Sequence, residues 1–168
     1  MKIRKETPAD FHDIWKLNAA AFEREVEANL VNILRVSGME YISLVAEKNR
    51  DIVGHILFTP VELEGDNSVT KLIGLSTIAV KPHLQKQGIG SRLIEQGIEC
   101  CKSEGYDAIF VIGHPNYYPR FGFLPSVDYN FVSEYDVPDD VFMVLELNKG
   151  CLKEKQGKIK YHEAFSSV

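Results

Sequence analysis

The first third of the chain carries apolar residues at helical spacing. Residues 2 to 6 predict a short edge strand, and Thr7-Pro8-Ala9-Asp10 then supplies an N-cap, a proline at the first helical position and an acid three residues after the cap. Helical periodicity predicts a helix from Pro8 and a second helix that ends at Ser37-Gly38. The residues expected on the inner faces are Phe11, Ile14, Trp15, Asn18 and Phe22 in the first helix and Val26, Leu30, Ile33 and Leu34 in the second.

The middle of the chain changes to apolar runs separated by polar turns. Tyr41–Glu47 and Ile52–Glu62 predict two antiparallel strands around a polar turn at residues 48–51. A loop at residues 65–68 leads to a further strand at Ile73–Val80, and a helix is expected from Gly88 until Lys102-Ser103-Glu104-Gly105. The stripe that this helix would lay on a sheet consists of Ile89, Leu93, Ile94, Gly97, Ile98 and Cys101.

The order of elements in the second half predicts a mixed α+β fold. The strand at 73–80, the helix after it and a strand at Ala108–Ile112 form a strand–helix–strand unit, whose two strands should be parallel with a right-handed crossover. Arg120-Phe121-Gly122-Phe123 predicts the beginning of a return strand, and Phe142–Leu147 predicts another. Near residues 158–161 we expect one extra short strand or a packed tail.

The segment between the strand at 73–80 and the following helix is a candidate anion site. Gly88 and Gly90 lack the Cβ atoms that would keep the backbone away from a ligand, and the first N–H groups of a helix have no intrahelical partner. Such places bind phosphates. A Walker loop would need Gly-Lys-Ser or Gly-Lys-Thr, whereas Ser91-Arg92 follows Gly90, and a dinucleotide fingerprint would need a small residue at Leu93.

Two separated motifs resemble those of the GCN5-related N-acetyltransferases, the GNAT family. Gln85-Lys86-Gln87-Gly88-Ile89-Gly90 is similar to the family's motif A, which is Gln or Arg, two residues, Gly, one residue, then Gly or Ala. Downstream, Tyr118 to Phe123 resembles the family's Tyr-x-x-x-Gly-Phe segment, in the expected order along the chain. Many members carry an Asn seven residues before that tyrosine, where this chain has Val111, and whether Asn116 substitutes for it stays open.

The resemblance implies the acyl-CoA N-acyltransferase fold. It implies a central, mostly antiparallel sheet with one splayed parallel strand pair, flanked by helices on both faces. We expect a single domain over residues 1–168, with a core of about residues 1–148 and a C-terminal extension over 149–168.

The ligand that the resemblance implies is acetyl-CoA, as cosubstrate and without a metal. Its pyrophosphate would lie on the N–H groups from Gln87 to Ser91, and its pantetheine arm would pair with the exposed backbone around Ile78 to Val80. A backbone N–H near Ile78 is a candidate for holding the thioester oxygen. The full set of expected coenzyme-binding residues is Ile78, Ala79, Val80, Gln85, Lys86, Gln87, Gly88, Ile89, Gly90, Ser91, Asn116 and Tyr118.

Tyr118 is the candidate catalytic acid, because a phenol with a reference pKa of about 10 is protonated at neutral pH and can donate to a departing thiolate. The alternative is that Tyr118 only packs beside Phe121 and Phe123. The acceptor would be a primary amine on a small molecule or peptide. The general base that removes a proton from this amine stays unassigned among Glu62, His55, His114 and a bound water. Acids at residues 23–27 either attract a cationic amine or form an ordinary solvated helix face.

Composition narrows the possible partners. The chain has 168 residues and a net charge of −5, and its pI is near 5.5, which argues against extensive contacts with a nucleic-acid backbone. No apolar run approaches a membrane span and no signal-peptide core follows Met1, so we expect a cytoplasmic monomer or homodimer. The three cysteines have no metal or disulfide spacing. The alternative function is a non-catalytic acyl-CoA-binding sensor, which would need no acid at Tyr118.

Overall fold

Two strands, β3 (Asp51–Leu63) and β4 (Leu72–Val80), run through both of the compact units into which the chain divides in the computed structural model. The structure describes residues 1–167. Unit 1 consists of residues 1–59, residues 76–99 and the C-terminal segment from Glu163, and unit 2 consists of residues 60–75 and 100–162. The predicted division into one core and a C-terminal extension stays a prediction.

The sheet of unit 1 follows the strand order β1-β2-β3-β4, with β1 at Lys2–Lys5 and β2 at Ile42–Lys48. Both β1–β2 and β2–β3 are antiparallel, as predicted for the β2–β3 hairpin. Its tight turn has positive φ at Asn49 (52°) and Arg50 (65°), the conformation that matches the right-handed twist of paired strands. A register shift at Ala46/Glu47 interrupts the ladder once.

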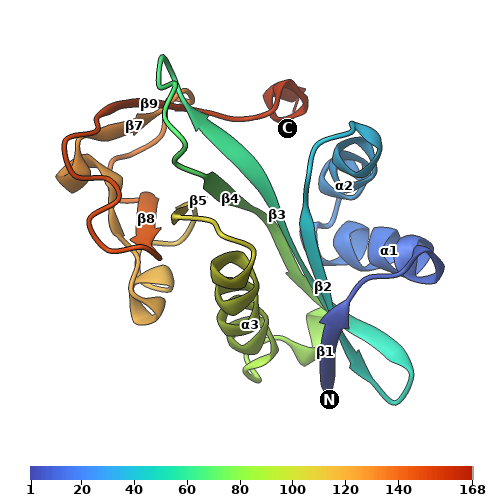
Figure 1. Cartoon of the computed structure of the whole chain (residues 1–168). Coiled ribbons are helices and arrows are strands. Elements are labelled where there is room, and N and C mark those ends of the chain that lie inside the picture. Colours follow the sequence, from blue (N-terminus) through green and yellow to red (C-terminus); the bar gives the residue numbers. More distant parts are fainter. Residues whose placement is uncertain (168) are drawn as a thin grey trace. The chain divides into compact units, whose positions relative to one another are not determined.

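Helices cover both faces of this sheet (Figure 1). On one face, α1 (Phe11–Phe22) and α2 (Val26–Val36) pack with strand residues in one buried cluster. The members of that cluster are Ile14, Leu17, Leu30, Val31, Leu34, Val45, Ile52, Leu57 and Ala79, with Ala164 and Phe165 of the C-terminal segment against it. On the other face lies α3 (Ile89–Ser103), where a Cβ on Gly97 would come within 2.4 Å of Phe58. Leu57 and Phe58 are consecutive and point to opposite faces, so helices flank the strand on both sides.

The N-terminal helices differ from the prediction in detail. Residues Pro8–Asp10 form a turn of 3₁₀ helix before α1, and the Asp10 carboxylate accepts the Thr7 N–H at 2.7 Å. Phe22 was expected on the inner face of α1, yet it is exposed and Leu17 is buried instead. In α2, Ile33 is also exposed, because Ala28 and Val31 share the buried face with Leu30 and Leu34.

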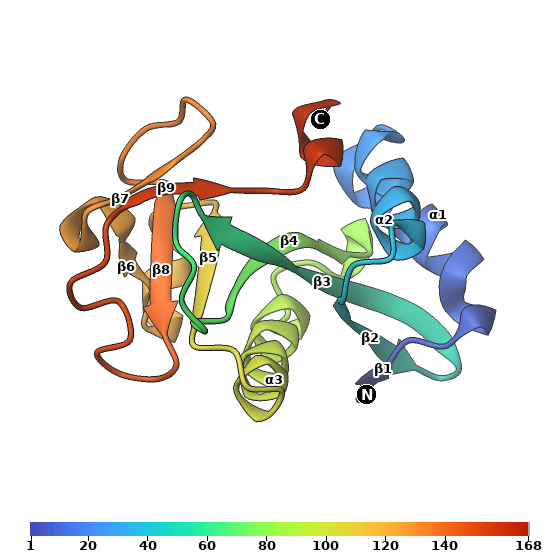
Figure 2. The same cartoon turned by 45° about the horizontal axis from the view of Figure 1, so that its top comes forward.

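Unit 2 contains the predicted parallel pair, in which β4 residues 72–74 lie beside β5 (Ala108–Ile112). The strand order continues from β5 to β8 (Phe142–Glu146) and β6 (Leu124–Pro125), and both added pairs are antiparallel. Strand β7 (Phe131–Ser133) pairs in parallel with β9 (Gly157–Lys160), which also pairs with the end of β3. Figure 2 shows β7 and β9 beside β8. A cluster around Phe110, Phe131 and Phe142 forms the core of this unit.

Two predictions for unit 2 need correction or refinement. The return strand expected to begin at Arg120 begins only at Leu124, because Tyr118–Phe121 form a 3₁₀ turn that Gly122 ends at a φ of 98°. The expected extra strand near 158–161 is confirmed as β9, and the short helix Glu163–Ser167 follows it. Within residues 1–167, no helix is both long enough and apolar enough to cross a membrane.

Candidate coenzyme site and its surroundings

The loop between β4 and α3 has the backbone of an anion site (Figure 1). After a 3₁₀ turn at Pro82–Leu84, Lys86 and Gly88 adopt positive φ values of 62° and 89°. In the described part of the chain, the N–H groups of Gln87 to Gly90 donate to no backbone carbonyl, and the Arg92 N–H donates to Gly88 O at 3.1 Å. These unpaired donors at the positive end of the α3 dipole favour an anion.

Side chains brace this loop and give it positive charge. The Gln85 amide donates to the Val80 carbonyl at 3.1 Å, and the Gln87 amide donates to the His83 carbonyl at 3.4 Å. Gln85 therefore ties the loop to the end of β4. Lys81 is ion-paired with Asp51, whereas Lys86 and Arg92 are exposed and, within residues 1–167, have no ion-pair partner. These two cations are available for an external phosphate.

Strand β4 alternates regularly where the pantetheine arm was predicted to pair, with Thr77 and Ala79 buried and Ser76 half-buried. Thr59 lies two residues after Leu57 and therefore shares its face, and the Thr59 and Ser76 hydroxyls hydrogen-bond at 2.6 Å. Ala79 packs in the same cluster as Leu57. Ile78 and Val80 are half-buried.

Tyr118 lies in unit 2 and is 6% exposed. Its ring meets those of Tyr117 and Phe123 edge-on, with centroids 5.3 Å and 5.7 Å away. Burial raises the pKa of Tyr118 to about 12, with a smaller contribution from Tyr117. The ring also lies against Gly113, where a Cβ would stand 2.3 Å from Tyr118 Cε2. Gly113 was missed by sequence reasoning, although a glycine directly after a strand and five residues before the tyrosine was a usable signal.

Val111 and Asn116, the two positions considered for the family's asparagine, lie in different surroundings. Val111 is 1% exposed and pairs with Met143 between β5 and β8, so it is a core residue. Asn116 is exposed, and its backbone N–H donates to His114 Nδ1 at 3.4 Å. Its role as a coenzyme-binding residue stays a prediction. Tyr118 and Asn116 belong to unit 2, whereas residues 78–80 and 85–91 belong to unit 1.

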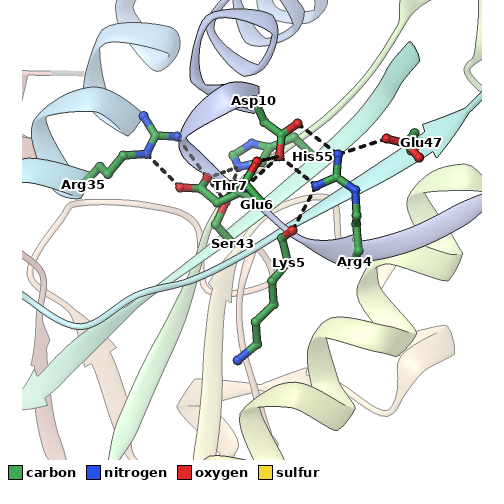
Figure 3. Close-up of polar contacts among 9 residues, drawn as sticks. All are labelled: Arg4, Lys5, Glu6, Thr7, Asp10, Arg35, Ser43, Glu47 and His55. Carbon is green, nitrogen blue, oxygen red and sulfur yellow. Dashed lines mark hydrogen bonds and ion pairs between the residues drawn. The ribbon is translucent and has the colours of Figure 1, made fainter. Parts of the chain in front are cut away.

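His55, one of the candidate bases, is instead the centre of a buried polar network in unit 1 (Figure 3). Asn18 Nδ2 lies 3.2 Å from His55 Nδ1, and Ser43 Oγ lies 2.8 Å from His55 Nε2. Because Asn18 Nδ2 can only donate, Nδ1 of the neutral ring accepts, and Nε2 carries the proton and donates to Ser43. Ser43 in turn donates to Glu6. Complete burial, and to a lesser degree the Arg35 charge, lower the pKa of His55 to about 3.

Ion pairs extend this network to α2 and to β1. Arg35 of α2 grips the Glu6 carboxylate with two hydrogen bonds of 2.9 and 3.0 Å, and both side chains are more than nine-tenths buried. Arg4 makes a similar pair with Asp10 at 2.8 and 3.0 Å and reaches Glu47 at 3.0 Å (Figure 3). The Arg4 guanidinium lowers the pKa of Asp10 to about 2. These ion pairs fasten α2 and the turn before α1 to the sheet. Asn18 and Ser43 already engage both nitrogens of His55.

The remaining candidate bases and acids are mostly at the surface. Glu62 and His114 are exposed in unit 2. Among the acids of the α1–α2 segment, Glu23 and Glu25 are exposed, but Glu27 is buried and accepts hydrogen bonds from Arg24. Glu27 therefore does not belong to a solvated helix face, and its buried charge is paired with Arg24.

Known proteins match the chain along most of its length. Residues 2–125 match the model of the acetyltransferase (GNAT) domain. The uncharacterized N-acetyltransferase YhbS of Escherichia coli K12 is 30% identical over 167 residues, which is 99% of each chain. The uncharacterized N-acetyltransferase YjhQ of the same strain is 37% identical over 135 residues, which cover 79% of this chain and 75% of YjhQ.

Two solved structures resemble the fold closely. The crystal structure of E. coli YhbS in complex with CoA has a TM-score of 0.93 at 30% identity, covering 98% of this chain and 91% of that one. A GNAT acetyltransferase from Brucella melitensis in complex with acetyl-CoA has a TM-score of 0.81 at 31% identity, covering 98% and 97%. By sequence and by fold, this chain belongs to the GNAT acetyltransferases, a family of acyltransferase enzymes.

Proposed function

We propose that this enzyme transfers an acetyl group from acetyl-CoA to a primary amine, by direct attack while both substrates are bound. The observation that carries the proposal is the loop from Lys86 to Gly90, whose left-handed backbone leaves consecutive N–H groups at the start of α3 without backbone partners among the described residues. A pyrophosphate is the anion that such an array fits. The CoA and acetyl-CoA complexes of the two similar proteins support the same ligand.

The rest of the coenzyme would follow β4 in this proposal. The peptide-like pantetheine arm pairs with the backbone of Ile78 to Val80 as an added strand would. The exposed cations Lys86 and Arg92 complement the phosphates. Asn116 contributes its exposed amide.

The reaction forms one bond and breaks one. The amine nitrogen attacks the thioester carbon, the oxygen becomes an oxyanion held by the Ile78 N–H, and the C–S bond then breaks. Tyr118 hydrogen-bonds to the departing sulfur and gives it a proton, and the proton that the attacking nitrogen loses as the amide forms restores the tyrosine hydroxyl. With a pKa of about 12, Tyr118 is fully protonated at neutral pH but is a weaker acid than a free phenol. The same desolvation raises the pKa of the leaving thiol in a buried site. The difference in pKa between the Tyr118 hydroxyl and that thiol is therefore smaller than the raised pKa of Tyr118 alone would give.

The acceptor must also lose a proton. An alkylammonium with a reference pKa of about 10.4 is handicapped by about 5 kcal/mol at pH 7. The burial of His55 and its engagement on both nitrogens remove it from the candidate bases. Glu62, His114 and water remain, and the base is unassigned.

Two measurements test this function. Acetyl-CoA should raise the melting temperature, since a ligand that binds only the native state stabilises it, and a panel of amines should then release free thiol from acetyl-CoA. No stabilisation at millimolar coenzyme would refute coenzyme binding itself. Stabilisation without thiol release, for any amine in the panel, would instead favour an acyl-CoA sensor.

The Tyr118→Phe variant separates catalysis from packing, because the ring is kept and only the hydroxyl is lost. Positioned proton transfer is worth about 10² to 10⁴ in rate, so kcat should fall within that range at unchanged coenzyme affinity. A normal kcat, where chemistry limits turnover, would assign Tyr118 to packing.

A further inference from the structure

Helix α2 has an exposed face without charge. All of residues 26–36 are described, and the exposed ones among them are Asn29, Asn32, Ile33 and Val36. Ile33 is 48% exposed and Val36 is 82% exposed. The charged residues of this helix, Glu27 and Arg35, have side chains that are more than nine-tenths buried in ion pairs. A surface helix normally has the opposite arrangement, with its charged residues facing the solvent.

The outward positions of α2 repeat at the spacing of a seam between two helices. Four residues follow one another at intervals of three, four and three positions, which is the a–d–a–d pattern of a heptad: Val26, Asn29, Ile33 and Val36. Such seams combine β-branched residues with a single asparagine that fixes the register. The inner stripe, which includes Leu30 and Leu34, already packs in the buried cluster of unit 1. The seam is therefore a second packing face, which the fold of unit 1 does not use.

Two asparagines on this face are held in place by their own chain. Trp15 Nε1 donates to Asn29 Oδ1 at 2.9 Å, and Arg35 donates to Asn32 Oδ1 at 2.7 Å. Within residues 1–167, neither asparagine nitrogen donates to a protein acceptor, and each amide oxygen has a second lone pair. Each amide can therefore donate to a copy of itself and accept from it, as a twofold contact requires.

We propose that the α2 outer face, made by Val26, Asn29, Asn32, Ile33 and Val36, binds the same face of a second copy of this chain. Two chains with a net charge of −5 repel each other, and a neutral face is where a second copy can approach at the least cost. A nucleic acid or an anionic membrane would find no complementary charge on this face. The inference is independent of the proposed acetyl transfer.

The contact should be weak because the seam is short. The 11 residues of α2 span about 16 Å. Trp15 and Phe22 of α1, which lies beside α2 in Figures 1 and 2, extend the apolar border. Contacts of this kind fall at the small end of specific interfaces, so we expect a dissociation constant of about 10 to 100 µM.

Sedimentation equilibrium at protein concentrations from about 1 to 500 µM, which bracket this constant, tests the proposal. The average mass of the wild type should rise from 19.0 kDa, the mass of one chain, towards twice that value. Val36→Glu and Ile33→Glu each place a charge in the seam of both copies, so the dissociation constant should rise about tenfold or more. Val132→Glu is the matched control, because Val132 is 50% exposed on β7 and the change in net charge is the same. Its association should equal that of the wild type.

Mixing two variants tests whether the face meets its own copy. Ile33 lies close to the middle of the seam, so an equimolar mixture of Ile33→Glu and Ile33→Lys should associate more tightly than either variant alone. Val36→Glu should keep the wild-type melting temperature at low concentration, because Val36 is largely exposed, and this separates loss of contact from loss of fold. A wild type that stays at the mass of one chain would overturn the proposal, and so would association that survives Val36→Glu. Neither result touches acetyl-CoA binding, which is measured separately.

Discussion

Replacing His55 with glutamine should remove most of the loss of stability that this protein suffers between pH 7 and pH 5. His55 is completely buried and neutral, and its pKa in the folded state is lowered to about 3 by burial and by Arg35. In the unfolded chain, a histidine has a reference pKa of about 6.5. Below pH 6.5 the unfolded state therefore binds a proton that the folded state cannot accept, and stability falls as the pH falls, until about pH 3.

The magnitude follows from the two pKa values. Each pH unit inside this window changes the free energy of unfolding by about 1.4 kcal/mol, so His55 destabilises the fold by about 2 kcal/mol at pH 5 relative to pH 7. The full difference, reached near pH 3, is about 5 kcal/mol, which is comparable to the whole stability of many domains. The Asp10 carboxylate acts in a lower window, below the ordinary aspartate pKa of 3.8, and does not overlap with this measurement.

Urea denaturation at pH 7, 6 and 5 measures the effect. The free energy of unfolding of the wild type should fall by about 2 kcal/mol more than that of His55→Gln over this range. Glutamine retains a donor that can reach Ser43 but cannot become charged. His12→Gln serves as a matched control, because His12 lies exposed on α1. Parallel pH profiles for wild type and His55→Gln would show that the network accommodates a protonated imidazole, contrary to the reasoning.

Three further predictions concern single contacts. Gly88→Val should weaken CoA binding by about tenfold or more, because a β-branched residue cannot easily adopt the φ of 89° that aims the loop, and a folded variant with unchanged affinity would move the phosphate site elsewhere. Gly113→Ala should lower kcat as Tyr118→Phe does and destabilise the fold by about 1 to 3 kcal/mol, because the new Cβ would stand 2.3 Å from the Tyr118 ring. A fully active variant would argue against a catalytic role that depends on the position of the Tyr118 hydroxyl. Asp10→Asn should destabilise the protein by about 2 kcal/mol at pH 7. This difference should disappear as the pH falls from about 3.8 to 2, because the wild-type carboxylate then becomes protonated. A constant difference in stability at all pH values would contradict the pairing with Arg4.

Periodicity predicted the elements whose pattern is local. The β2–β3 hairpin, the strand–helix–strand unit around α3 and strand β8 depend on apolar runs and turn residues that are adjacent in sequence. The return strand at Arg120 was wrong because the aromatic residues there pack against one another across a 3₁₀ turn, with Tyr117 and Phe121 rings 5.3 Å apart, and alternation alone does not reveal that packing. Glu27 was polar in the pattern, yet Arg24 makes its burial possible.

In the candidate site, too, the features with a local sequence signal could be predicted. Gly88 indicated a backbone conformation that favours glycine, and its φ of 89° agrees with that prediction. The fate of His55 could not be predicted, because its partner Asn18 comes from α1, and the sequence pattern does not say which strand residues that helix meets.

The short C-terminal helix Glu163–Ser167 belongs to unit 1 although the strand before it, β9, belongs to unit 2. It contacts α2, some 130 positions earlier, and Phe165 covers the cluster beneath α1 and α2. During synthesis, that cluster stays partly uncovered until the ribosome has released these last described residues. Contacts this distant in sequence close a large loop late, which slows folding. A substitution at Phe165 therefore acts on helices that are far from it in sequence.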